Sequence, residues 1–291
     1  MSLEVLENAV ITLLKLAVVK LPEDVKSALE KAYRAERSPI GKAQLEAILD
    51  NIKIAEETGT PMCQDTGLTS FYLEAGSRFE GLERVEGILR RAIRRATVEV
   101  PLRPNAVDPF TQENTNDNTG RQVPYMHWRI VDGDFLEITT VPNGGGSENM
   151  SALKMMSADE GTYGLKKFVI ENVVEAGGLP CPPTIIGLGV GGGPNIAMNL
   201  AKLALLKPLD EPEPDKTVAR LERELYEAVN RTGVGPMGLG GDSTTLGVKI
   251  EYAHRHPASY PVAVAFHCWA ARRATARIHS NGDVEYLTHK V

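Results

Sequence analysis

The sequence predicts a mixed α/β fold, in which a helical N-terminal segment precedes mixed strands surrounded by helices. Three observations lead to this class. Residues 3–58 repeat apolar side chains at helical spacing, short apolar runs typical of strands alternate with helical patterns after residue 70, and no internal repeat interrupts them. We expect one catalytic domain over residues 1–291, with residues 1–60 as a helical prelude.

The prelude is expected to contain three helices. Pro22 opens the second helix, and the third runs from about residue 41 to residue 58 with an apolar stripe along one face. Gly59 and Pro61 end this helix and place the next residues on a loop.

A long polar stretch interrupts the regular elements after the prelude. A short strand is expected over residues 70–75, an amphipathic helix over 82–98 and another strand over 135–141. Between these last two, residues 101–124 are polar and irregular. Loops of this length are uncommon in a compact domain unless they have a function, so a surface loop and a functional loop are both open.

The C-terminal half continues with alternating elements. Ser157 and Glu160 form a capping box for a helix that ends near Ala176. The remaining predicted elements are a buried strand at 183–190, helices at 194–206 and 217–231, strands at 246–252, 262–267 and 274–279, and a closing hairpin at Asn281-Gly282.

Composition and charge exclude several classes of protein. The formal net charge is −6, whereas nucleic-acid binding needs a basic surface. No apolar run approaches the roughly 20 residues of a membrane span, and the N-terminus lacks the basic and apolar regions of a signal peptide. An odd number of cysteines without an export signal indicates reduced thiols. We therefore predict a cytoplasmic protein that binds neither nucleic acid nor membranes.

The three cysteines, Cys63, Cys181 and Cys268, each lie in a turn-like setting beside polar or proline residues. A cysteine used only for packing more often lies within an apolar run. Their spacing matches neither the close pairs of structural zinc sites nor the motifs of ferredoxins. Either the tertiary structure assembles them into one metal site, or they are three unrelated thiols, and spacing alone favours the second reading.

Two glycine-rich stretches imitate nucleotide-binding motifs. Residues 187–192 fit the dinucleotide fingerprint, but the required second strand with its acidic end is absent from residues 207–214. Residues 233–245 resemble a phosphate loop, yet Asp242 replaces the lysine that would meet the phosphates. We interpret both stretches as close-packed loops that allow the backbone to approach a cofactor or an anion.

The sequence around each cysteine resembles the iron–sulfur hydro-lyase family, which includes class I fumarases and the alpha subunit of L-tartrate dehydratase. The resemblance covers nearly the whole chain in several motifs that occur in order. These motifs are 61–67, 101–109, 113–120, 145–149, 181–193 and 254–273.

The resemblance implies a [4Fe–4S] cluster held by Cys63, Cys181 and Cys268, with one iron not ligated by cysteine. Such an open iron is a Lewis acid that can polarise a substrate hydroxyl. The opposing interpretation from a different class is a zinc-stabilised or metal-free binding protein.

The resemblance also assigns roles around the cluster. Asp65 protonates or steers the departing hydroxyl, and Gln64 hydrogen-bonds the substrate. Arg103 clamps a substrate carboxylate, and Gly146 lets a backbone amide approach the substrate. His256, in extended backbone before a proline, transfers a proton or orients a group. The structural alternatives are an ordinary Asp-Thr-Gly turn, a salt bridge of Arg103 within its loop and a structural histidine.

By resemblance, the chain is expected to be the cluster-bearing alpha subunit of a hydro-lyase, converting fumarate to L-malate reversibly as in the citric acid cycle. L-Tartrate or a methyl-substituted fumarate is the alternative dicarboxylate substrate. Single-chain relatives carry a second domain with the base that deprotonates carbon. Because this chain stops at Val291, we expect a separate beta subunit to complete the site, and alpha subunits that pair within a hetero-oligomer.

Overall fold

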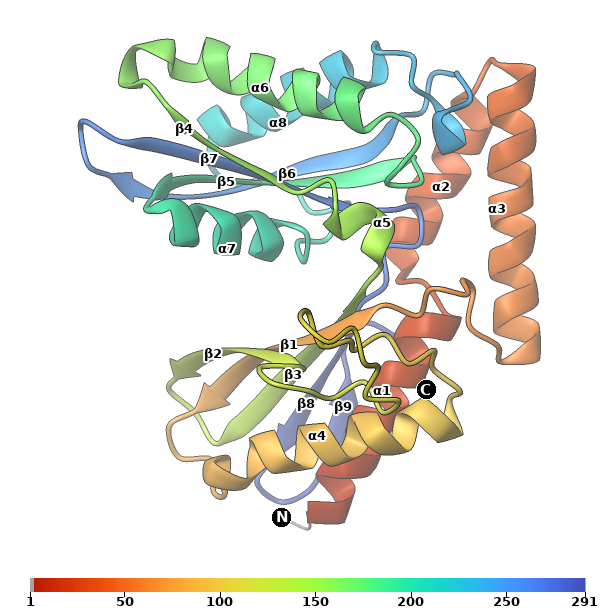
Figure 1. Ribbon diagram of the computed structural model, residues 1–291, viewed down its shortest axis with the longest axis vertical. Coiled ribbons are helices and arrows are strands. Elements are labelled where there is room, and N and C mark those ends of the chain that lie inside the picture. The colour runs from red at the N-terminus through yellow and green to blue at the C-terminus, as the bar shows by residue number, and fades with distance from the viewer. Residues whose placement is uncertain (1–2, 291) are drawn as a thin grey trace. The chain divides into compact units, whose positions relative to one another are not determined.

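The computed structural model describes residues 3–290 and divides them into two compact units (Figure 1). The first unit comprises residues 3–23, 51–145 and 272–290, and the second comprises 24–50 and 146–271. Each unit contains a sheet and helices, so the predicted mixed α/β class is confirmed. The single catalytic domain over residues 1–291 stays a prediction.

The first unit is built on a five-stranded mixed sheet with the strand order β2-β1-β3-β8-β9. Strands β1 and β2 are parallel, and all other neighbours in this sheet are antiparallel. The strands are β1 (Leu68–Gly76), β2 (Tyr125–Val131), β3 (Phe135–Asn143), β8 (Ala274–His279) and β9 (Val284–Tyr286).

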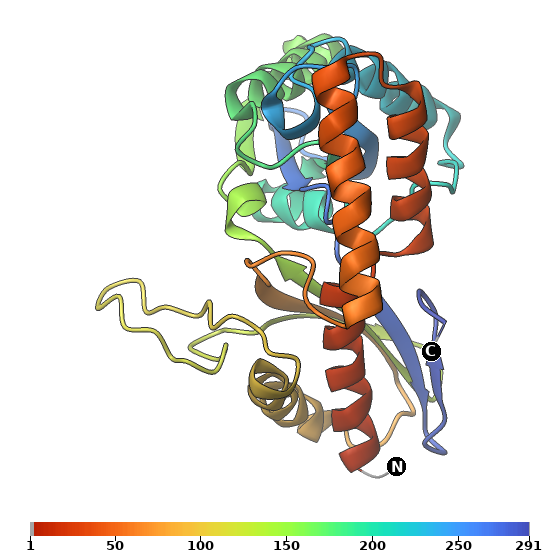
Figure 2. The ribbon, with the colours of Figure 1, turned by 90° about the vertical axis from the view of Figure 1, so that its right-hand side faces the viewer.

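Helices α1 (Leu3–Val19) and α4 (Leu82–Glu99) bury their apolar stripes against this sheet. Alternate residues of β1 are buried, as expected for a strand with one face in the core. The resulting core includes Leu13, Phe71 and Ile88. The chain between α4 and β2 is the long irregular loop predicted from the sequence, and it reaches out beside α4 (Figure 2).

The second unit has three layers, with α7 on one face of a four-stranded sheet and α6 and α8 on the other (Figure 1). The strand order is β4-β7-β5-β6. Its strands are β4 (Ala152–Met156), β5 (Thr184–Gly192), β6 (Thr245–Arg255) and β7 (Tyr260–His267), and its main helices are α6 (Gly161–Ala176), α7 (Pro194–Ala204) and α8 (Lys216–Asn230).

In three further helices the chain passes from one unit to the other. These are α2 (Glu23–Ala35), α3 (Pro39–Thr58) and the single turn α5 (Gly145–Glu148). The predicted three-helix prelude is confirmed, with its third helix starting slightly earlier than expected. Across residues 3–290, none of the helices combines the length and the apolar character that crossing a membrane requires.

Strands β2 and β4 were not predicted, and both lie at the edge of their sheets. An edge strand has a neighbour on one side only. Most residues of β2 and β4 are exposed or half-buried, so they lack the alternation of buried and exposed residues that identifies a strand. The predicted capping box is confirmed, because the Ser157 N–H donates to Glu160 Oε1 at 2.9 Å just before α6.

The glycines that imitate a dinucleotide fingerprint lie inside strand β5, not in a loop as expected. A Cβ atom on Gly189 would lie 1.8 Å from the carbonyl oxygen of Ala197, and one on Gly187 would lie 2.2 Å from that of Ala201. Both carbonyls belong to α7. The glycines therefore allow a helix to pack directly on the strand backbone.

A Gly189→Ala substitution is expected to lower the free energy of unfolding by about 2–3 kcal/mol, because the new methyl group overpacks the contact between β5 and α7. Chemical denaturation monitored by circular dichroism measures this. The matched control is Gly87→Ala in α4, where the nearest atom to a new Cβ is 3.8 Å away, so helix propensity adds up to about 1 kcal/mol of stability. Equal stability of the two variants would contradict the packing argument.

Candidate active site

Cys63 and Asp65 lie on the loop between α3 and β1 in the first unit. The residue before Cys63 is held on both sides: the Met62 N–H donates to the Val18 carbonyl at 2.9 Å, and Asn51 Nδ2 donates to the Met62 carbonyl at 2.8 Å. Cys63 is half-buried, and its sulfur lies 3.6 Å from Oε1 of the exposed Gln64. The loop therefore presents a thiol, an amide and a carboxylate from consecutive residues.

The Asp65 carboxylate accepts hydrogen bonds from three different segments of the first unit. Oδ1 accepts from the Gly67 N–H at 3.0 Å and from Asn105 Nδ2 at 3.3 Å, while Oδ2 accepts from the Gly145 N–H at 2.8 Å. Gly67 has a φ of 82°, and a Cβ there would lie 2.7 Å from the backbone of Pro142. A glycine is thus required for this turn, which fixes the direction of the carboxylate.

Arg272 holds the backbone of Asp65. Its side chain is 2% exposed, and Nη1 donates to the Asp65 carbonyl oxygen at 2.6 Å. Nε is buried without a partner among residues 3–290. A Cβ on Gly144 would lie 3.2 Å from Asp65 Oδ2 and 3.3 Å from Arg272 Nη2, so the absence of a side chain there lets both groups approach. The sequence motifs predict no role for Asn105 or Arg272.

Arg103 is joined to the same loop through Thr66. The Arg103 N–H donates to Thr66 Oγ1 at 2.9 Å, although the two residues are 37 positions apart. The side chain of Arg103 is exposed, and its guanidinium forms no ion pair with any residue between 3 and 290. The loop salt bridge considered as the structural alternative is therefore not found in this part of the chain, and an unpaired cation stands on a fixed backbone.

Cys181 and Cys268 lie together at one end of the sheet in the second unit. Cys181 precedes β5, Cys268 follows β7, and these strands are antiparallel with Ile185 opposite His267. The Trp269 N–H donates to the Cys181 carbonyl at 3.1 Å. Both cysteines are half-buried. The φ of Cys181 is 54°, a strained backbone for a residue with a side chain, and such strain is common at functional sites.

Gly146 also lies beside the Cys181 loop. A Cβ on Gly146 would lie 3.0 Å from the Leu179 carbonyl oxygen. That oxygen is 4.0 Å from the sulfur of Cys181. The exposed backbone of Gly146 is thus brought close to a predicted ligand of the same unit.

The second glycine-rich stretch supports the Cys181 loop. The Met237 N–H donates to the Pro182 carbonyl at 2.7 Å. A Cβ on Gly178 would lie 2.9 Å from the Met237 carbonyl oxygen, and one on Gly238 would lie 2.4 Å from the Gly178 Cα. The two backbones therefore pack against each other, which confirms close packing as the use of these glycines.

Buried Glu36, in the turn between α2 and α3, ties down the end of this glycine-rich stretch. Its carboxylate accepts from the N–H groups of Asp242, Ser243, Arg37 and Ser38 at 2.9–3.1 Å. The Arg37 guanidinium in turn pairs with the Asp242 carboxylate at 2.8 Å. Asp242 therefore has a structural partner in the position where a phosphate loop would carry lysine.

These contacts shift the protonation equilibrium of Glu36. Burial alone would raise the pKa of this carboxyl, but the hydrogen bonds from Asp242, Ser38 and Ser243 outweigh burial and lower the pKa. The ionised form is consequently the one that the folded chain stabilises.

His256 is not brought to the cysteines of its own unit. It lies on the turn between β6 and β7, is exposed, and accepts a hydrogen bond from the Ala258 N–H at Nδ1. Cys268 follows the other end of β7. An eight-residue strand is about 25 Å long, so the imidazole and this thiol lie at opposite ends of the sheet. A catalytic role of His256 stays a prediction.

The predicted site residues thus form two groups, one in each unit. Cys63, Gln64, Asp65 and Arg103 lie together in the first unit, and Cys181, Cys268 and Gly146 lie together in the second. Within either unit, the described residues 3–290 contain no set of three or more His, Cys, Asp or Glu side chains that could hold a metal ion by itself.

Comparison with known proteins gives a family and named relatives. The sequence model of the fumarate hydratase (Fumerase) family matches residues 7–277. A protein of Methanocaldococcus jannaschii, provisionally named L(+)-tartrate dehydratase subunit alpha, is 47% identical over 277 residues, covering 94% of this chain and 97% of that protein. The L(+)-tartrate dehydratase subunit alpha of Escherichia coli (strain UTI89) is 41% identical over 271 residues, covering 93% of this chain and 89% of its own length.

Glu36→Gln is expected to lower the free energy of unfolding by about 2 kcal/mol at pH 7, because an amide replaces a carboxylate that accepts several N–H groups. Since the folded pKa is lowered, this stabilisation is fully present above the unfolded pKa of about 4.3 and is lost as the pH falls through the folded pKa. Urea unfolding at pH 7 and at successively lower pH measures both effects.

The matched control is Glu46→Gln, which changes an exposed residue of α3 in the same unit. It should leave the unfolding midpoint within experimental error of the wild type at pH 7. If Glu36→Gln and the wild type lose stability in parallel on acidification, the assignment of the pH dependence to Glu36 is wrong.

Proposed function

This chain belongs to the fumarate hydratase (Fumerase) family, and we propose that it is the cluster-bearing alpha subunit of a hydro-lyase acting on a four-carbon dicarboxylate. The family resemblance predicted from the cysteine motifs is thereby confirmed. One observation carries the proposal: Asp65 and Arg103 lie far apart in sequence but close together in the first unit. The Arg103 N–H donates to the hydroxyl of Thr66, which directly follows Asp65 on the loop that carries Cys63.

Cys63, Cys181 and Cys268 are the proposed ligands of a [4Fe–4S] cluster. The donor set fits, because thiolates are the usual ligands of such clusters and all three cysteines are half-buried on loops. The loops of Cys181 and Cys268 are also joined by the hydrogen bond from the Trp269 N–H to the Cys181 carbonyl. When bound, the cluster supplies a Lewis-acidic iron that is not ligated by cysteine. The chain itself also links the two groups of residues: Gly145, whose N–H binds Asp65, is followed directly by Gly146.

Three side chains of the first unit have the remaining roles in substrate binding and proton transfer. Arg103, with an exposed guanidinium on a fixed backbone, suits two-pronged binding of a substrate carboxylate. Asp65 is held in one orientation by its three N–H donors and serves to protonate or steer the departing hydroxyl. Gln64 extends from the same loop with an exposed amide that can hydrogen-bond the substrate. Positioning of this kind accounts for a large share of enzymatic rate enhancement.

Two substrates are supported by different observations. Fumarate, hydrated reversibly to L-malate, is the first candidate, because the matching family is described as fumarate hydratase. L-Tartrate is the second candidate, because the relatives that share 40–47% identity carry the name L(+)-tartrate dehydratase. L-Malate, the product of fumarate hydration, and L-tartrate both present two carboxylates and a hydroxyl-bearing carbon to the same residues.

A partner subunit is part of the proposal. The named relatives are alpha subunits, and we propose that a separate beta subunit completes the site and carries the base that deprotonates carbon. The pairing of alpha subunits within such a hetero-oligomer and a cytoplasmic location stay predictions.

Anaerobic reconstitution of the chain should yield about four iron and four sulfide per protein, with the broad visible absorption of a cubane cluster. Cys63→Ser is expected to lose most of this iron, because a serine hydroxyl is a poor substitute for a thiolate. A colourless wild-type protein that contains zinc would falsify the cluster assignment. Full iron content in Cys63→Ser would remove Cys63 from the ligand set.

The assembled enzyme should interconvert fumarate and L-malate or dehydrate L-tartrate, and the ratio of kcat/KM values identifies the substrate. The isolated chain is expected to hold a cluster but to turn over little of either compound. Absorbance at 240 nm follows fumarate, and a coupled assay follows oxaloacetate from tartrate. Normal rates from the isolated chain would refute the need for a beta subunit, and an inactive assembled enzyme would refute the hydro-lyase proposal.

A further inference from the structure

Asn118 is a buried polar residue in the long loop between α4 and β2, and every polar group of its side chain has a partner. It is 4% exposed. Nδ2 donates to Thr97 Oγ1 at 3.0 Å and to the Arg103 carbonyl at 3.1 Å, while Oδ1 accepts from the Asn105 N–H at 2.7 Å. One side chain therefore joins helix α4 to both residues of this loop that belong to the candidate site.

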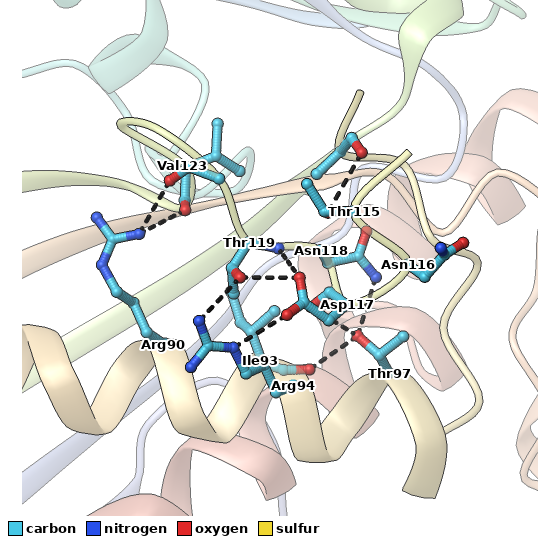
Figure 3. Close-up of polar contacts among 12 residues, drawn as sticks. Arg90, Ile93, Arg94, Thr97, Thr115, Asn116, Asp117, Asn118, Thr119 and Val123 are labelled. Carbon is cyan, nitrogen blue, oxygen red and sulfur yellow. Dashed lines mark hydrogen bonds and ion pairs between the residues drawn. The ribbon is translucent and has the colours of Figure 1, made fainter. Parts of the chain in front are cut away.

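The segment around Asn118 is anchored firmly on α4 (Figure 3). The Arg94 guanidinium pairs with the Asp117 carboxylate at 3.0 Å, and Asp117 Oδ1 also accepts from the N–H and the hydroxyl of Thr119. The Thr97 hydroxyl, which receives the Asn118 amide, donates to the Ile93 carbonyl within the same helix. Asn118 is thus supported by hydrogen bonds and an ion pair to helix α4.

The backbone at Asn118 explains the choice of residue. Its φ is 59°, a left-handed conformation that asparagine tolerates better than most residues with a side chain. The contacts also require one group that donates twice and another that accepts. Asparagine meets both demands in a short side chain, whereas aspartate cannot donate and glycine has no amide to offer.

We propose that Asn118 is a positioning residue that fixes where Arg103 and Asn105 lie relative to Asp65. This inference rests on the proposed function. Arg103 is held at its N–H by Thr66 and at its carbonyl by Asn118. The Asn105 side chain reaches Asp65 Oδ1, while its N–H is held by Asn118. Asn118 acts only through these neighbours.

The loss of activity expected on removing the Asn118 side chain follows from the geometry that a carboxylate clamp requires. A carboxylate clamp works within about 0.5 Å of its productive position, and a displacement of about 1 Å can lower a rate by about a hundredfold. Removing the Asn118 amide releases one hydrogen bond from Arg103 and one from Asn105. Substrate binding through Arg103 should therefore suffer first, and the chemical step through Asp65 should change less.

The test compares Asn118→Ala with Asn116→Ala in the assembled enzyme. Asn116 has a φ of 63° in the same loop, so both variants carry alanine in a left-handed position. Its side chain is exposed, and among residues 3–290 it bonds only to Asn114. N118A is expected to raise KM for the dicarboxylate by about tenfold with a smaller fall in kcat, whereas N116A should leave both close to wild type. Equal effects of the two variants would overturn the inference.

A double-mutant cycle shows whether the effect passes through Arg103. In an Arg103→Ala background, N118A should raise KM no further, because the clamp is already absent. Additive changes in KM would overturn the inference. Asn118→Asp is the variant to use if N118A does not fold, because it keeps the size and the acceptor for Asn105 but loses both donors. It should raise KM like N118A.

Hydrogen exchange provides a readout that does not depend on activity. The Asn105 amide should lose protection in N118A and keep it in N116A and N118D, since only N118A removes its acceptor. Unchanged protection in N118A would refute the positioning role itself. An assembled wild-type enzyme that is inactive on every dicarboxylate would instead refute the proposed function, so the two failures are distinguishable.

Discussion

The hydrogen bonds to the carboxylate of Asp65 are the constraint on which the first unit's share of the candidate site depends. Gly67, Asn105 and Gly145 come from three segments that are far apart in sequence, and each donates an N–H group to the same two oxygens. A half-buried carboxylate needs such partners, because unpaired polar groups are costly to bury. Meeting this requirement draws the loop after α3, the loop after α4 and the end of β3 together beside Cys63.

The second unit also brings its candidate site residues together, but through strand pairing and backbone packing. Its two cysteines are placed by antiparallel strands and by close contact between backbones, which glycines permit at Gly178 and Gly238. Glu36 then secures the glycine-rich stretch through backbone N–H groups. In both units a carboxylate that accepts several N–H groups organises irregular backbone: half-buried Asp65 in the first unit and buried Glu36 in the second. Loops positioned in this way can present reactive groups with precision on a rigid scaffold.

Several elements could be predicted from the sequence because their signals are local. Helices α1 to α4 and the buried strands β5 and β7 have apolar periodicity or continuous apolar runs within one segment. The edge strands β2 and β4 lack such a signal. The roles of Asn105 and Arg272 had no local signal either, since Arg272 meets Asp65 across 207 residues of sequence. For His256 the motif indicated a site residue, yet the strand between it and Cys268 separates the two within their unit.

The sequence by itself determined the mixed α/β class, the family and which side chains are candidates for binding or catalysis. These can be read from the sequence because motifs and periodicity are properties of neighbouring positions. Only the tertiary structure decided which of these residues meet. It joined Asp65 to Arg103 through Thr66 and brought the loop of Cys181 beside that of Cys268. It also placed the fingerprint glycines, which were expected in a loop, within strand β5. The physical reason is that hydrogen bonds and close packing act between groups adjacent in space, and the order of the chain does not specify that adjacency.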